Sequence, residues 1–341
     1  MDRRPGEVLR GQLGRRGQVT GPPAGSSPAP SVVLHVEEAG MFSTIQDLGR
    51  PGRRAAGVPP GGAMDRFALS AANLLVGNPE GAAALECALS GPTLVAVRTC
   101  LVAVTGADFG ATLNGRALPG WTGVFLSEGD RLAFTGRRWG ARAYVAVAGG
   151  LAGDRWLGSA ATYLLVGRGG VHGRPLQARD VLSLAAPAPR PVVVGRCLPD
   201  LLRPAYAAEP ELSAIGGPHA GLLAPASRRA LFREPWQVSR DADRMGYRLE
   251  GEVLTVKSQE LVSFGLAMGC VQVPPAGQPI LLMADHQTAG GYPVVAGVAR
   301  CDLPLAAQLL PGQRLRFREV GVEEAQGEWR RLRAALDGLK R

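Results

Sequence analysis

Short apolar runs recur along the chain, and glycine or polar turn residues bound each of them. Clear examples are residues 32–36, 93–97, 101–105, 131–135, 141–148 and 181–184. Runs of this length, separated by turns, are typical of β-strands. The 47 Gly and 27 Pro leave little room for long strands or for strands alternating with helices. The pattern therefore predicts a mainly β protein built from barrels or sandwiches.

Two segments are instead predicted to be helical. Residues 65–75 place Phe67, Leu69 and Ala72 at apolar positions, and Asp65 stands where a side chain can cap the first turn. Residues 323–339 form a second amphipathic segment that is rich in arginine. We therefore expect a β protein with a few short helices.

Composition divides the chain into parts. Residues 1–31 are rich in Gly, Pro, Ser and Arg and cannot bury an apolar face, so we expect a disordered tail. The proline-rich stretch 185–191 has the composition of a linker. It separates a predicted N-terminal domain at 32–185 from a C-terminal domain at 191–320, which a helix at 321–341 follows.

Charge and hydropathy exclude several classes of protein. No apolar run approaches the roughly 18–20 residues of a membrane span, and the N-terminus has no signal-peptide pattern, so we expect a cytoplasmic protein. The net charge of +9 comes from scattered arginines without interleaved aromatic residues, which argues against nucleic-acid binding. The five Cys have no metal-ligand spacing and the four His are far apart, so we expect reduced thiols and no metal site.

The common cofactor motifs are missing from the sequence. The Lys257-Ser258 pair does not belong to a P-loop motif, because Val256 stands where the motif needs Gly. No Rossmann fingerprint, nucleophile elbow or zinc-protease motif occurs. A biotin carrier presents a lysine between two methionines, and neither Lys257 nor Lys340 has that setting. We therefore expect no covalent biotin on this chain.

Seven polar, glycine-rich segments occur in one order along the chain. They are QDLGRPG (46–52), GVPPGGAMD (57–65), ANLLVGN (72–78), TGAD (105–108), DRMGYRLEG (243–251), QVPPAGQPI (272–280) and DHQTAGGYP (285–293). In this order they resemble the family of the bacterial 5-oxoprolinase C subunit, over about residues 32–320. The family is related to urea amidolyase and to the second allophanate-hydrolase-like subunit. The resemblance implies two cyclophilin-like β-barrel domains.

The resemblance also implies a function and partners. It implies an ATP-dependent opening of 5-oxo-L-proline to L-glutamate, with ATP and Mg²⁺ acting at the level of a complex. A protein like the 5-oxoprolinase B subunit would be the direct partner, and one like the A subunit would complete the complex. Two alternatives stay open. One is a biotin-dependent carboxyltransferase acting on urea or a related amide, and the other is a regulatory partner of a kinase inhibitor.

The sequence departs from the family pattern at two places. In GSAATY (158–163), Ala160 and Ala161 stand where the family usually has Arg and Ser, and Ala289 stands where it usually has Thr. If the family's Arg binds an anion, its loss alters substrate choice or activity.

Several polar residues have both a functional and a structural interpretation. Asp47 and Arg50 could form an ion pair that fixes their loop, or Arg50 could grip a substrate carboxylate. Asp108, at the end of an apolar run, suits either acid–base chemistry or a turn. Arg244 suits an ion pair with Asp243 or a substrate contact.

The segment 285–292 combines acceptors, donors and two glycines that allow close approach of a ligand, although a tight hairpin would use the same residues. Within it we expect His286 to be a bystander. Arg168 and Arg174 flank a glycine-rich loop that could contact phosphate or be a solvated hairpin. The predicted catalytic residues are Asp47, Asp108 and Asp285, and the predicted substrate contacts are Arg50, Asn73, Arg244, Gln272, Gln287, Thr288, Gly290, Gly291 and Tyr292.

Overall fold

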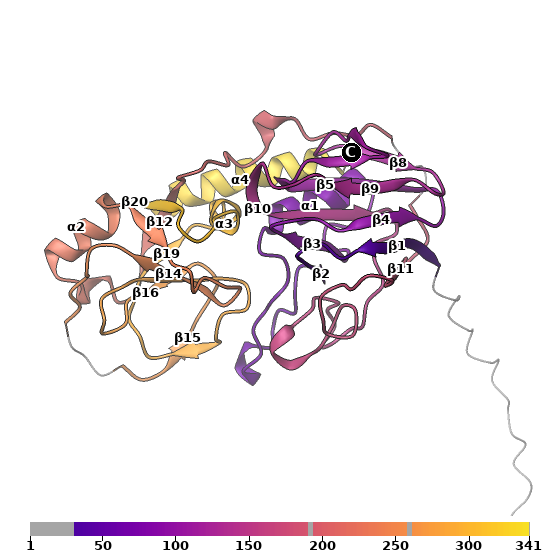
Figure 1. Ribbon diagram of the computed structural model, residues 1–341. Helices are drawn as coiled ribbons and strands as arrows, with labels where there is room; N and C mark the ends of the chain where they lie inside the picture. The colour runs from indigo at the N-terminus through magenta and orange to yellow at the C-terminus, as the bar shows by residue number, and fades with distance from the viewer. Residues whose placement is uncertain (1–30, 190–193, 258–260, 341) are drawn as a thin grey trace, which may run out of the picture.

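The computed structural model describes residues 31–189, 194–257 and 261–340 (Figure 1). The expected disordered tail, apart from residue 31, and the end of the expected linker lie outside the described residues. Figure 1 shows two lobes side by side, with strands β1–β11 in one and β12–β20 in the other. The prediction of a mainly β protein with a few short helices is confirmed.

The N-terminal lobe contains two antiparallel sheets that enclose one apolar core. The first sheet has the order β11 (Val181–Ser183), β1 (Val32–Glu38), β4 (Thr93–Ala96), β9 (Arg131–Phe134), β6 (Ala111–Leu113) and β7 (Arg116–Ala117). The second has the order β2 (Phe42–Gln46), β3 (Ala84–Ala88), β10 (Trp139–Val147), β5 (Cys100–Asp108) and β8 (Gly123–Leu126). Alternating side chains of both sheets, such as Leu34 and Val145, fill the space between them.

The C-terminal lobe is a closed barrel. Its strands follow the order β12 (Glu211–Gly216), β19 (Val294–Val298), β16 (Cys270–Gln272), β17 (Ile280–Leu282), β14 (Gly246–Glu250), β13 (Trp236–Val238) and β20 (Arg314–Glu319). The parallel pairing of β20 with β12 closes the ring, so no edge is left open. Trp236, Phe317 and Leu281 fill the interior and are fully buried. A two-stranded sheet of β15 (Phe264–Gly265) and β18 (Ala289–Gly290) lies beside it.

Four α-helices occur among the described residues. The two predicted helices are present as α1 (Arg66–Leu75) and α4 (Val322–Gly338). Asp65 caps α1 as expected, because its Oδ1 accepts a hydrogen bond of 2.8 Å from the Ala68 N–H. The sequence did not predict the other two helices, α2 (Pro225–Arg233) and α3 (Leu303–Ala307). Helix α2 buries only three side chains and α3 has only five residues, so neither has a clear helical pattern of apolar positions. Single 3-10 turns are η1 (Arg54–Ala56), η2 (Leu164–Val166), η3 (Asp200–Leu202) and η4 (Ala220–Leu222).

Helix α4 ties the two lobes together. It follows β20 of the barrel and packs against α1 of the other lobe, with Leu332 and Leu336 in the same apolar cluster as Leu74 and Leu75 (Figure 1). Among the described residues, no helix has the length and apolar character to cross a membrane.

Gln308, directly after α3, adds a polar connection between the lobes. Its Oε1 accepts hydrogen bonds of 3.0 Å from the N–H groups of Ala141 and Arg142, at the β10 end of the other lobe. Its Nε2 donates to the Asp65 carboxylate at 2.9 Å and to the Arg142 carbonyl at 3.1 Å. One buried side-chain amide thus provides hydrogen-bond partners both for backbone groups of β10 and for the Asp65 carboxylate that caps α1.

We predict that Gln308→Ala lowers the free energy of unfolding by about 2–5 kcal/mol, because buried backbone N–H groups lose their acceptor. Denaturant titration followed by circular dichroism measures the loss. Gln237→Ala is the matched control, since Gln237 is exposed and makes a single long bond to the Gly312 carbonyl. Equal stability of the two variants would contradict the assigned role.

Candidate functional site between the lobes

Arg244 lies at the junction of the lobes, two residues before β14. Its Nε donates to Asp285 Oδ2 at 2.7 Å, and its Nη1 donates to Glu86 Oε1 at 2.5 Å. Glu86 lies in β3 of the N-terminal lobe, whereas Asp285 follows β17 of the barrel. Burial alone would lower the pKa of Arg244, but the carboxylates of Asp285 and Glu86 raise it above its usual value. The guanidinium therefore joins two lobes through charges that water scarcely reaches.

Glu86 continues this network into the N-terminal lobe. Its Oε2 accepts hydrogen bonds from the Met64 N–H at 2.8 Å and from the Tyr144 hydroxyl at 2.7 Å. The Tyr144 oxygen in turn accepts from the Asp65 N–H at 2.8 Å. Segment 57–65 is thereby fixed at its C-terminal end, beside Arg244.

Asp47 organises the loop after β2. Its carboxylate accepts hydrogen bonds of 2.7 Å from the Gly49 N–H, the Ser159 hydroxyl and the Ala160 N–H. Asp47 and Arg50, both described residues, make no ion pair with each other. The carboxylate thus fixes the turn and the altered GSAATY segment, and it leaves the Arg50 guanidinium available. Because Ala160 contributes its backbone here, the contact does not depend on its side chain.

Arg50 is the most unusual side chain of the site. It is 1% exposed, and its Nη2 donates to the Ala161 carbonyl. The guanidinium carbon lies 5.1 Å from the Trp156 ring centre and 5.7 Å from that of Tyr163. Its Nε and Nη1 are buried without a hydrogen-bond partner among the described residues. Burial lowers the pKa of Arg50. A buried cation with two unused donors is arranged to receive an anion.

Gly61 brings Arg50 close to Asp285. A Cβ added at Gly61 would lie 2.8 Å from Arg50 Nη1 and 3.2 Å from Asp285 Oδ1, so a side chain there would collide with the site. Gly61 also has a φ of +60°, which disfavours other residues. The free donor of Arg50 and the carboxylate of Asp285 therefore face the same small space beside the backbone of Gly61.

His286 is fully buried next to Asp285. Its Nδ1 lies 2.7 Å from the Gln287 carbonyl oxygen, which can only accept, so Nδ1 carries the proton. Nε2 is then an acceptor, and it is buried with no partner among the described residues. Burial lowers the pKa of His286 and keeps the ring neutral. The site thus contains an unused acceptor as well as unused donors.

The rest of segment 285–292 leads away from this cluster. Gln287 donates to Gln272 at 3.2 Å, and Gln272 donates to the Tyr292 carbonyl at 3.2 Å. Thr288 accepts through its carbonyl from the Leu266 N–H, and Gly290 pairs in the β15–β18 sheet. Gly291 is exposed, and Tyr292 is 46% exposed and lines a separate cavity of about 220 Å³.

Three other predicted residues are engaged elsewhere. Asn73 is fully buried and donates to the carbonyls of Glu80 and Ala82, so it holds the loop after α1. Arg174 forms two bonds of 2.7–2.8 Å with the Asp180 carboxylate. Arg168 lies in an exposed loop.

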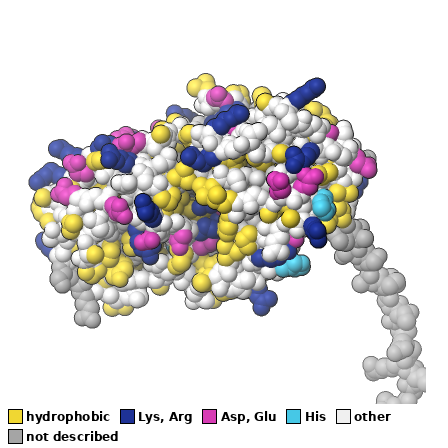
Figure 2. All heavy atoms as spheres, in the orientation of Figure 1, with side chains coloured by type: hydrophobic (Ala, Val, Ile, Leu, Met, Phe, Trp, Pro, Cys, Tyr) yellow, Lys and Arg dark blue, Asp and Glu magenta, His cyan; other side chains and the backbone are white. Residues whose placement is uncertain are grey.

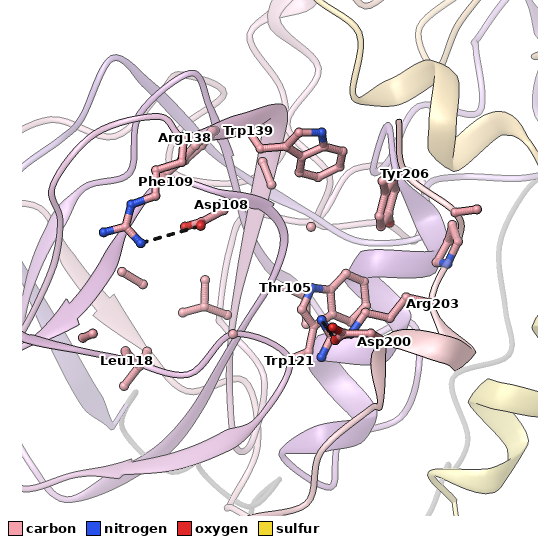
Figure 3. A pocket seen from close by; sticks show the side chains of 18 residues that line it. Thr105, Asp108, Phe109, Leu118, Trp121, Arg138, Trp139, Asp200, Arg203 and Tyr206 are labelled. Atoms are coloured by element: carbon pink, nitrogen blue, oxygen red, sulfur yellow. Dashed lines mark ion pairs between the residues drawn. The ribbon is translucent and has the colours of Figure 1, made fainter. Parts of the chain in front are cut away.

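Asp108 lies in a different cavity, of about 620 Å³ (Figure 3). Its Oδ1 accepts from the Gly110 N–H at 2.7 Å, the geometry of a turn, and Oδ2 lies 3.7 Å from Arg138 Nη1. Trp139 of β10 pairs with Asp108 in the sheet, and Figure 3 shows Tyr206 and Arg203 farther across the cavity. None of the other predicted site residues lines this cavity.

The structure therefore brings Asp47, Arg50, Arg244 and Asp285 together and separates Asp108 from them. Figure 2 shows hydrophobic and basic side chains gathered around the hollow between the lobes. The sequence interpretation missed Trp156, Tyr163 and the pairing of Glu86 with Arg244. The signal for Glu86 was a lone carboxylate inside the apolar run 84–88. No group of three or more metal-ligating side chains occurs in the described part of the chain.

Comparison with known proteins identifies the family. Residues 56–319 match the family "carboxyltransferase domain, subdomain A and B". This chain belongs to that family. The match includes the 57–65 loop, Arg244 and Asp285, and thus most of the interlobe network.

Individual relatives extend the comparison. The 5-oxoprolinase C subunit of Escherichia coli (strain K12) is 40% identical over 86% of this chain and 93% of the relative. The 5-oxoprolinase C subunit of Haemophilus influenzae is 36% identical over 88% of this chain and 95% of the relative. The crystal structure of the Kluyveromyces lactis urea amidolyase superposes with a TM-score of 0.86 at 26% identity, over 92% of this chain and 20% of the larger one. The resemblance inferred from the seven segments is confirmed.

We predict that Arg244→Met destabilises the protein by about 3–5 kcal/mol, because the buried Asp285 carboxylate loses its ion-pair partner and Glu86 keeps only the longer contact of 3.6 Å with Arg142. Chemical denaturation measures the loss. Arg248→Met is the control, since Arg248 is exposed and its side chain bonds the Asp241 carbonyl rather than a carboxylate. Equal stability of the two variants would refute the structural importance of the interlobe ion pairs.

Asp65 should make stability depend on pH. Burial raises the pKa of Asp65 from 3.8 to about 6, although hydrogen bonds from Ala68, Tyr206 and Gln308 oppose this. The folded state then holds the proton more tightly than the unfolded state, so this contribution is complete below pH 3.8 and is lost as the pH rises through 6.

We predict that the stability difference between wild type and Asp65→Asn, which cannot titrate, shifts by about 2.4 kcal/mol against the wild type between about pH 4 and pH 7. Urea denaturation of both proteins across this range measures it. A difference that does not vary with pH would contradict the raised pKa.

Proposed function

We propose that this chain is a subunit of an ATP-dependent 5-oxoprolinase that converts 5-oxo-L-proline to L-glutamate. The identity of 40% to the Escherichia coli 5-oxoprolinase C subunit, over nearly the whole of both chains, supports this most strongly. The overall reaction hydrolyses the lactam C–N bond of the substrate and hydrolyses ATP to ADP and phosphate.

The site between the lobes suits the substrate proposed. 5-Oxoproline carries one carboxylate, and Arg50 offers buried N–H donors on Nε and Nη1 that can donate a charge-assisted hydrogen bond to it. The lactam N–H needs an acceptor. Asp285 Oδ1 faces the same space as Arg50 Nη1, and the neighbouring His286 keeps a buried Nε2 without a partner among the described residues. We propose that Arg50 binds and orients the substrate, while Asp285 and His286 are the acceptors available to the lactam.

We propose that ATP and Mg²⁺ act in the complex of this chain with its partner subunits. The two arginines predicted to contact phosphate do not form a cradle in this chain, because the Asp180 carboxylate already holds Arg174. The described residues around them therefore do not fit a nucleotide. We propose that the nucleotide binds with the help of a partner subunit.

Partner proteins are part of this proposal. The Escherichia coli relative is named as the C subunit of 5-oxoprolinase, which implies a multi-subunit complex for that protein. We propose a protein like the 5-oxoprolinase B subunit as the direct partner and a protein like the A subunit as the third component.

A biotin-dependent carboxyltransferase is the second candidate. The close structural match to the Kluyveromyces lactis urea amidolyase and urea carboxylase favours it. A biotin carrier would then have to come from another protein. ATP-dependent glutamate release without any biotin protein separates the first function from the second.

We predict that co-expression with A-subunit-like and B-subunit-like partners yields ATP-dependent glutamate release from 5-oxoproline. Arg50→Gln should lower kcat/KM by about 10–100-fold, because a charge-assisted hydrogen bond to the substrate is lost. Arg116→Gln, which changes an exposed arginine of β7, is the control. An assay of glutamate with purified complexes measures both variants.

Two results would overturn the proposal. The absence of glutamate release from an assembled, folded complex would exclude the 5-oxoprolinase function. Equal kcat/KM values for Arg50→Gln and Arg116→Gln would remove Arg50 from the substrate site. Arg50 is a cleaner test than Asp285, since substitution of Asp285 would also unpair Arg244.

A further inference from the structure

A further cavity lies beside the interlobe site, with a volume of about 340 Å³. It opens between α1, α3 and α4, and its apolar wall includes Phe67, Leu303 and Trp329. None of Asp47, Arg50, Arg244 or Asp285 lines it. Its size falls within the range of cavities that bind small molecules.

Arg66, in the first turn of α1, is one of the basic residues that line this cavity. Its Nη2 donates to the Gly61 carbonyl at 3.2 Å, and its Nε is buried with no partner among the described residues. Within the part of the chain that the structure describes, no carboxylate forms an ion pair with it. Burial lowers the pKa of Arg66, and the positive charge of Arg300 lowers it further. Arg66 is therefore a cation in need of a counter-charge.

Arg300 is exposed and lines the same cavity. Its guanidinium carbon lies 4.3 Å from the Trp329 ring centre, so the ring orients it. It too has no ion-pair partner among residues 31–189, 194–257 and 261–340. Two arginines of like charge thus face one space, and neither is neutralised.

The remaining charged groups of the cavity neutralise one another. Glu80 is the carboxylate of the lining, and it accepts hydrogen bonds from both Arg333 and Lys340. The Arg333 hydrogen bond lowers the pKa of Glu80, which stays ionised. Its charge is therefore committed to these two cations, and the cavity keeps the uncompensated charge of Arg66 and Arg300.

We propose that this cavity binds a small organic anion with a flat apolar body. Its carboxylate or phosphate lies between Arg66 and Arg300, whose positive charges no carboxylate of the described residues neutralises. Its apolar part packs against Phe67 and Trp329. An anion alone would leave the apolar wall uncovered, and an apolar molecule alone would leave both arginines unpaired.

Three probes separate these contributions in isothermal titration calorimetry of the full chain. Phenyl phosphate and benzoate carry a ring with a phosphate or a carboxylate, and benzyl alcohol carries the ring without a charge. We expect saturable binding of at least one of the two anions and none of benzyl alcohol. Whichever anion binds more tightly identifies the head group that the arginines prefer.

Variants assign the binding to this cavity. Arg300→Gln should weaken binding of the anion by about tenfold or more, because a charge-assisted contact is lost. Arg314→Gln, an exposed arginine of β20, should leave it unchanged. Trp329→Phe should remove the change in tryptophan fluorescence that binding produces. Thermal unfolding confirms that each variant is folded.

Three outcomes would overturn this proposal. They are the absence of saturable binding by both anions, equal binding by Arg300→Gln and Arg314→Gln, and loss of binding in Arg50→Gln with retention in Arg300→Gln. The last would show that the anion occupies the interlobe site instead. Because these measurements need neither turnover nor a partner protein, they are independent of the 5-oxoprolinase activity.

Discussion

The arrangement of the two lobes depends on one buried guanidinium. Arg244 bonds Glu86 of one lobe and Asp285 of the other, and its side chain is only 11% exposed. Such a charge is stable inside a protein only when its partners are complete, since removing one leaves another buried charge unpaired. The relative position of the lobes is thereby coupled to the position of Asp285, which is part of the candidate site.

The close approach of Arg244 and Asp285 also explains why the loop 57–65 is rich in glycine. The loop passes between Arg50 and Arg244, and its central backbone groups have defined partners: Gly61 N–H donates to the Ala284 carbonyl, and the Gly62 carbonyl accepts from Arg244. A side chain at Gly61 would fill the space between Arg50 and Asp285. The loop therefore forms a wall of the site because it contributes backbone and almost no side chain.

The surplus of buried donors gives the region its chemical character. Arg50 and Arg66 both approach Gly61 of this loop, and both keep buried nitrogens without partners among the described residues. Unsatisfied buried donors are rare in folded proteins because each costs free energy. Three of them on two neighbouring arginines point to anionic ligands, and this agrees with the carboxylate-bearing substrate proposed for the interlobe site.

The sequence by itself determined the mainly β class, both long helices and the family. Strand length, the Asp65 cap and the order of seven segments are features of the sequence itself, and they do not depend on how the two lobes are arranged. It also singled out Arg50 and Asp285, but as separate segments. Only the tertiary structure decided which predicted site residues lie close together. It placed Asp108 in another cavity, and it engaged the Asp47 carboxylate in hydrogen bonds that fix a turn. It also paired Arg244 with Glu86 across 158 positions rather than with its neighbour Asp243. Charge pairing between lobes depends on distance in space and on burial, and neither is encoded in sequence spacing.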